Sequence, residues 1–164
     1  MTRGRAVAIM LVALAVGGYA FWPGSDEREI KRALASLAAD FNDETTFDGL
    51  GGVSRAGQLG SYFSEDAVVD LGPGSAQVEG RDKVISVAAR LQPRTAAFRV
   101  ALDDVGVEPA GDDQADVTLT VSFINRTSTA HEPSTDAREF LLRMTKGGGR
   151  WRIARATAVD TFRK

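Results

Sequence analysis

The sequence contains no cysteine and only one histidine, His131, among its 164 residues. The absence of cysteine excludes disulfide bonds, thiolate catalysis, zinc sites with cysteine ligands and lipidation at a cysteine. A single histidine excludes metal sites that need several imidazole ligands. We therefore expect neither a metal ion nor a cofactor in this protein.

An excess of positive charge is also missing. The chain has 20 Lys and Arg against 22 Asp and Glu, which gives a net charge of −2. Proteins that bind nucleic acids draw most of their affinity from Lys and Arg on phosphates, so we expect no nucleic-acid partner. Charged residues make up 26% of the chain and hydrophobic residues 43%, which is typical of a globular protein.

An uncharged, apolar stretch runs from Ala6 to Trp22, directly after Arg3 and Arg5. As a helix these 17 residues would extend roughly 25 Å, just enough to cross a thin hydrocarbon core. Aromatic residues gather at the end of the stretch, as they do at membrane interfaces. We predict that residues 1–24 form a single-pass anchor in a bacterial-type inner membrane. The domain at 25–164 would then lie outside the cytoplasm.

A cleaved signal peptide is the alternative interpretation of residues 1–24. It would have the same basic start and apolar middle, and Gly18-Tyr19-Ala20 is an acceptable small-x-small cleavage site. The protein would then be secreted. A buried helix of the soluble domain is a third interpretation.

The remaining chain predicts one domain with the element order α-α-β-β-α-β-β-β-β. Apolar residues at helical spacing predict helices at 26–41, 53–63 and 81–91, the first opening on a capping box of Asp26 and Glu29. Strands are predicted at 67–71, 76–79, 98–107 and 115–123, around 140–144, and from residue 151 onward. A change of alternation after Leu102 predicts a β-bulge near Asp103 and Asp104.

Short turns between consecutive strands predict antiparallel pairing. A curved antiparallel sheet with three amphipathic helices on one face leaves a pocket between the helices and the sheet. The fold class expected is therefore α+β.

Three segments resemble the NTF2-like (nuclear transport factor 2, SnoaL-like) superfamily: EIKRALASLAADF, YFSEDAVVDLGPGSAQVEGRDKV and REFLLRMTKGGGRWRIARATAV. The resemblance covers about residues 26–159. It implies a cone, in which a curved and largely antiparallel sheet carries three helices on its concave face. It also implies a homodimer that pairs through the outer face of the sheet.

Enzymes of this superfamily, such as ketosteroid isomerase, transfer protons with a carboxylate base and a tyrosine inside an apolar cavity. Matching SEDAVVDLG to the corresponding isomerase strand places Leu71 where the base would be. Asp70 is one residue away and should face the opposite side of the strand. Ala33 falls where the oxyanion tyrosine would be, so we expect the isomerase constellation to be absent.

Other residues are candidates for chemistry in the pocket. Asp70, Tyr62 and His131 are the catalytic candidates. The simpler explanations, which we favour, are a strand-end carboxylate, a core-filling ring and a solvated loop histidine. Asp136 and Arg138 share the strand parity of Phe140 and are candidates for an ion pair at the pocket mouth, with a purely structural pair as the alternative.

Two functional hypotheses follow from these observations. The first is a membrane-anchored, non-catalytic NTF2-like domain that binds a small apolar ligand or a protein partner. The second is a small isomerase, dehydratase or hydrolase that uses a cavity carboxylate with Tyr or His. A cavity lined only by Leu, Val, Phe and Ala would favour the first, and a buried carboxylate facing a Tyr or His would favour the second.

Overall fold

The computed structural model describes residues 23–43, 50–72, 75–91, 98–125 and 134–159. Their element order confirms the predicted one and the α+β class. The elements are α2 (Pro23–Asn42), α3 (Leu50–Gly60), β1 (Phe63–Asp70), β2 (Val78–Glu79), α4 (Arg81–Leu91), β3 (Phe98–Gly111), β4 (Gln114–Asn125), β5 (Ser134–Gly147) and β6 (Arg150–Ala158).

The predicted membrane segment lies outside the described residues. Among the helices that are described, none is both long and apolar enough to cross a bilayer. The anchor at residues 6–22 therefore stays a prediction.

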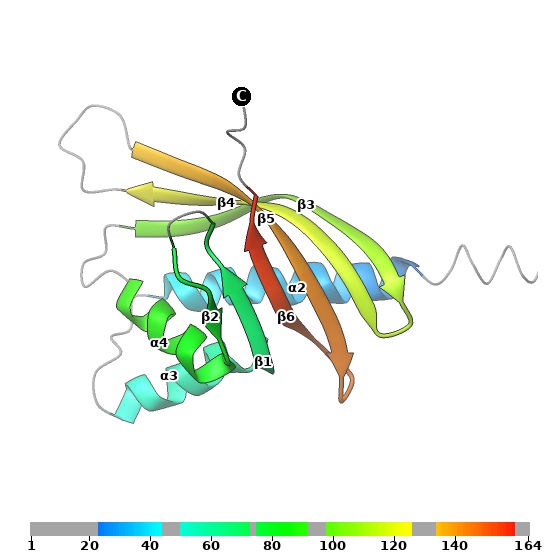
Figure 1. The fold of residues 1–164 in the computed structure, drawn as a ribbon, viewed down its shortest axis with the longest axis horizontal. Coiled ribbons are helices and arrows are strands. Elements are labelled where there is room, and N and C mark those ends of the chain that lie inside the picture. The colour runs from blue at the N-terminus through cyan, green and yellow to red at the C-terminus, as the bar shows by residue number, and fades with distance from the viewer. Residues whose placement is uncertain (1–22, 44–49, 73–74, 92–97, 126–133, 160–164) are drawn as a thin grey trace, which may run out of the picture.

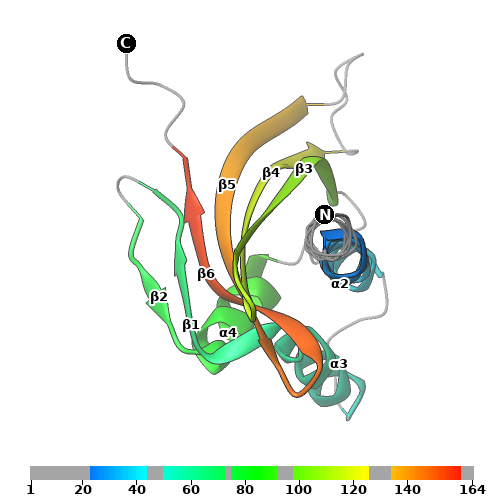
Figure 2. The same cartoon turned by 90° about the vertical axis from the view of Figure 1, so that its right-hand side faces the viewer.

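The described strands form one six-stranded sheet in the order β2-β1-β6-β5-β4-β3 (Figure 1). The pairing is antiparallel throughout this order except between β1 and β6, which run parallel. Figure 2 shows the sheet curving around the helices, with α2 on its concave side near β3. Helices α3 and α4 contact each other and β1, and so close one end of the half-cone.

Two of the predicted helices have boundaries that shift by three residues. Helix α2 begins at Pro23 rather than at Asp26, because proline is well tolerated in the first turn. Asp26 therefore lies inside the helix, and the predicted capping box is wrong. Helix α3 spans Leu50–Gly60 rather than 53–63, since the chain turns at Ser61 and Tyr62.

Strand β1 begins at Phe63, four residues before the predicted start. Phe63 is paired with Ile153 of β6, and the Ile153 amide donates a hydrogen bond to the carbonyl oxygen of Tyr62 at 2.8 Å. This pairing joins distant parts of the chain, so local alternation gives no sign of it.

The predicted β-bulge is present in β3. Asp103 is paired with Thr120 and Gly106 with Thr118, which leaves one extra residue on β3. Asp104 takes a φ of 52°, and a Cβ at Gly106 would come within 2.8 Å of the Thr118 hydroxyl oxygen. The bulge restores the inward direction of the apolar residues that follow it.

The hydrophobic core lies between α2 and the central strands. Alternate residues of β4, β5 and β6 point to the concave face, as the period of a half-buried strand requires. The buried cluster consists of Ile30, Leu34, Ala115, Val117, Leu119, Phe140, Leu142, Met144, Trp151, Ile153 and Ala156.

Candidate functional site

A cavity of about 210 Å³ opens between the concave face of the sheet and helices α2 and α4. Within the described part of the chain, every residue that lines it is Leu, Val, Phe or Ala. These residues are Leu34, Leu37, Phe63, Val69, Leu71, Val78, Val84, Val87, Ala88, Leu102, Leu119, Val121, Phe140, Leu142 and Ala156. Such a surface offers water no hydrogen-bond partners and favours an apolar occupant.

The local sequence explains this lining. Leu119 and Val121 of β4 are two residues apart and share a face, and Leu119 is paired with Phe140 of β5. Helix α4 adds Val84, Val87 and Ala88 at a spacing that keeps them on one side of the helix. Strand parity and helical periodicity together produce an apolar wall.

Asp70 lies at the end of β1, where its neighbours Val69 and Leu71 line the cavity. Its side chain accepts a hydrogen bond from the Gly72 amide at 2.9 Å, and Gly72 takes a φ of 93° in the turn that follows. The carboxylate is thus engaged with the turn that leaves the strand.

Tyr62 lies in the turn between α3 and β1. Its hydroxyl group donates a hydrogen bond to Oδ2 of Asp40 on α2, with 2.6 Å between the two oxygen atoms. Burial of the ring, together with the hydrogen bond and the negative charge of Asp40, raises the pKa of Tyr62 to about 12. The hydroxyl therefore stays protonated at neutral pH, and its proton is directed at α2.

Sequence analysis did not single out Arg55, which is only 7% exposed. From α3, its Nη2 donates to the carbonyl oxygen of Asp40 at 2.7 Å and to that of Asp43. These carbonyls lie at the C-terminus of α2, where the helix dipole favours a cation. A possible signal was the position of Arg55 four residues before Leu59, which put a charge on the apolar face of α3.

Asp136 and Arg138 are not among the residues that line the cavity. They form an ion pair on β5, with 3.9 Å between Oδ2 and Nε, and their side chains are 70% and 54% exposed. His131 lies outside the described residues.

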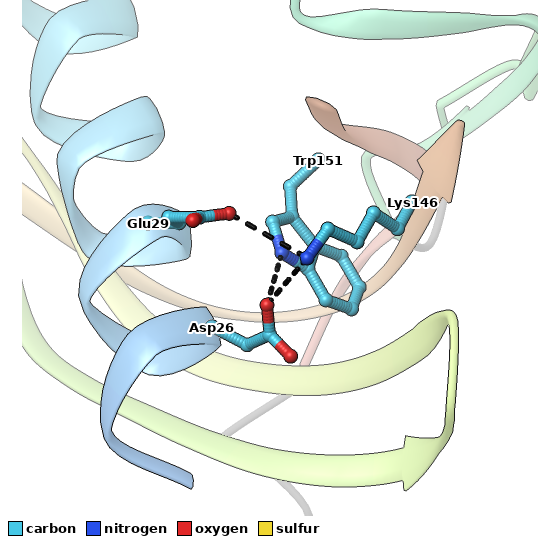
Figure 3. Close-up of polar contacts among 4 residues, drawn as sticks. All are labelled: Asp26, Glu29, Lys146 and Trp151. Atoms are coloured by element: carbon cyan, nitrogen blue, oxygen red, sulfur yellow. Dashed lines mark hydrogen bonds and ion pairs between the residues drawn. The ribbon is translucent and has the colours of Figure 1, made fainter. Parts of the chain in front are cut away.

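A second polar cluster joins the first turns of α2 to the β5–β6 hairpin (Figure 3). Lys146 Nζ lies 2.6 Å from Oδ1 of Asp26 and 3.7 Å from Oε2 of Glu29, and Trp151 Nε1 donates to the same Asp26 oxygen at 3.4 Å. The Asp26 hydrogen bond is the main cause that raises the pKa of Lys146. The cluster fixes the start of the helix against the sheet.

A model of the SnoaL-like domain matches residues 25–157. A comparison with the curated proteins found no significant match.

Several solved structures share the fold. A proposed scytalone dehydratase from Novosphingobium aromaticivorans has a TM-score of 0.66 at 16% identity, covering 84% of this chain and 85% of that one. A proposed aromatic ring hydroxylase from the same organism has a TM-score of 0.66 at 18% identity, covering 86% and 92%. Aln2 from Streptomyces has a TM-score of 0.64 at 14% identity, covering 83% and 91%. At these identities the similarity concerns the fold.

Proposed function

This chain belongs to the SnoaL-like domain family, and on that premise we propose that it is a binding protein that takes a small apolar ligand into the cavity between its helices and sheet. The observation that carries the proposal is the composition of the wall, which in the described part of the chain is Leu, Val, Phe and Ala throughout. Transfer of an apolar molecule from water to such a surface is favourable by roughly 25 cal/mol per Å² removed from water.

Catalysis of the isomerase or dehydratase type would need a proton donor or acceptor that faces the ligand. The carboxylate of Asp70 accepts a hydrogen bond from the Gly72 amide, and the hydroxyl of Tyr62 donates a hydrogen bond to Asp40. Both groups are thus engaged with neighbouring protein groups. Their arrangement supports binding without chemistry.

Filling the cavity should weaken ligand binding. Ala88 of α4 lines the cavity, so Ala88→Leu adds three carbon atoms to a space that a ligand would use. With naphthalene as the probe, we expect the unaltered protein to melt at a higher temperature when the probe is present. The dissociation constant of the Ala88→Leu variant should rise by about tenfold or more.

The matched control is Ala89→Leu, which makes the same change one position further along α4 and outside the residues that line the cavity. It should bind naphthalene as the unaltered protein does. Calorimetric titration of all three proteins decides the matter. Absence of naphthalene binding by the unaltered protein, or equal binding by Ala88→Leu, would refute the proposed function.

We also propose that the domain lies outside the cytoplasm and is tethered by residues 6–22. The basic start and the uncharged run that follows support this orientation. A native mass spectrum of the full-length protein purified from a membrane fraction should show the uncleaved chain, and a mass beginning at Phe21 would favour the secreted form. Uncleaved protein in the cytosolic fraction would contradict both. The same spectrum reports whether the chain is a homodimer.

A further inference from the structure

The concave row of β5 runs from the cavity wall out to solvent. Leu142 and Phe140 are buried and line the cavity. Arg138 and Asp136 continue the same row at the spacing of one strand face, and their side chains are 54% and 70% exposed. Figures 1 and 2 show the first part of β5 standing clear of helices α2 and α4. The cavity therefore opens toward the beginning of β5.

Strand β4 shows the same change from buried to exposed and places Arg138 beside the cavity. Leu119 is buried, whereas Val121 is partly exposed, and both line the cavity. Val121 is the register partner of Arg138. Partners in an antiparallel pair lie on one face, with their Cβ atoms about 4.5–5.5 Å apart. The side chain of Arg138 therefore starts next to the cavity wall, on the cavity side of the sheet and at the mouth.

The guanidinium of Arg138 is held only loosely. Among the described residues, Asp136 supplies its one carboxylate within ion-pair distance, and the 3.9 Å between Nε and Oδ2 is too long for a hydrogen bond. A pair that is this far apart and this exposed to water is weak. A ligand carboxylate can replace Asp136, since the planar donors of arginine match both oxygens of a carboxylate.

We propose that the ligand is a carboxylate with an apolar body, and that the body lies in the cavity while the carboxylate binds Arg138 at the mouth. The inference rests on the proposed function, because it assigns a chemical class to the ligand of the same cavity. The apolar wall offers a charged group no partner, so the bound ligand keeps its carboxylate at the mouth, hydrated and paired. Asp136 competes with the ligand for the guanidinium.

The test uses calorimetric titration with two probes of the same shape and different charge, 2-naphthoate and 2-naphthamide. At neutral pH and low salt, we expect the unaltered protein to bind 2-naphthoate about fivefold more tightly than the amide, and this preference to shrink as salt is added. Arg138→Gln should remove the preference. Asp136→Asn should act in the opposite direction and strengthen 2-naphthoate binding about threefold, because the competing carboxylate is gone.

Arg143→Gln is the matched control. Arg143 lies on the same strand but on the opposite face of the sheet, where its register partner is Asp116 and the two side chains form an ion pair. The variant makes the same charge change away from the cavity and should leave the preference for 2-naphthoate intact. Circular dichroism checks that each variant is folded.

The outcomes separate this inference from the proposed function. If naphthalene binds but the two charged and uncharged probes bind equally, the inference is overturned while the cavity remains a binding site. The same holds if the preference survives in Arg138→Gln, is lost in Arg143→Gln, or does not rise in Asp136→Asn. Undiminished 2-naphthoate binding by Ala88→Leu would also overturn it, because the aromatic body would then lie outside the cavity. Failure of both probes and of naphthalene to bind would refute the proposed function itself.

Discussion

Replacing Leu119 by aspartate is expected to unfold the domain. Leu119 is 3% exposed, lies in the middle of β4 and is paired with Phe140 of β5. A carboxylate at this position would be removed from water without a cation beside it. Burying such a charge costs several kcal/mol. This cost is a large part of the free energy of unfolding of a typical domain, which is roughly 5–15 kcal/mol.

Thr118→Asp is the matched control, since it places the same charge on the adjacent residue of the same strand. Thr118 is exposed on the opposite face of the sheet, so this variant should stay folded with a urea midpoint close to that of the unaltered protein. Circular dichroism during urea titration measures both. A Leu119→Asp variant that unfolds at the same urea concentration as Thr118→Asp would mean that water reaches the cavity wall freely.

The parts of the fold that local patterns determine were predicted correctly. Helix α4 has the predicted bounds, Arg81–Leu91, because its apolar residues recur at helical spacing. The bulge in β3 was visible as a change of phase in the alternation. In both places the side-chain period is set by the backbone geometry of a single element, so the sequence of that element is sufficient.

Contacts between distant segments were not predicted. Asp26 and Lys146 are 120 residues apart in the chain. The local sequence predicted that Asp26 caps a helix, but in the structure its carboxylate binds Lys146. The parallel pairing of β1 with β6 likewise moved the start of β1 to Phe63. In these cases a tertiary partner outweighs a local preference, and a single sequence does not identify that partner.

The same distinction holds for the candidate site. The resemblance to the isomerase strand placed Leu71 on the cavity side, and strand parity turned Asp70 away from it. Leu71 is among the residues that line the cavity, and Asp70 is not. A groove between α2 and the edge strand β3 could not be foreseen, because it depends on how far the helix stands from that strand. Helix spacing from a sheet edge is decided by packing across the whole concave face.

Arg55→Met is expected to destabilise the domain by about 2–4 kcal/mol. Methionine preserves much of the side-chain volume but removes the donors that reach the carbonyl oxygens of Asp40 and Asp43 at the end of α2. These oxygens lose a charge-assisted hydrogen bond where the helix dipole is negative. Differential scanning calorimetry and urea unfolding should both show the loss.

Arg81→Met is the matched control, because Arg81 is also a helical arginine with an acidic partner. Its Nη2 lies 3.7 Å from Oε1 of Glu65, whose side chain is 88% exposed, and such a solvated pair contributes on the order of 1 kcal/mol or less. If Arg55→Met were no more destabilising than Arg81→Met, water would have to replace the guanidinium at the end of α2. The contacts between α2 and α3 would then depend on apolar packing alone, and the position of α2 over the cavity would not require Arg55.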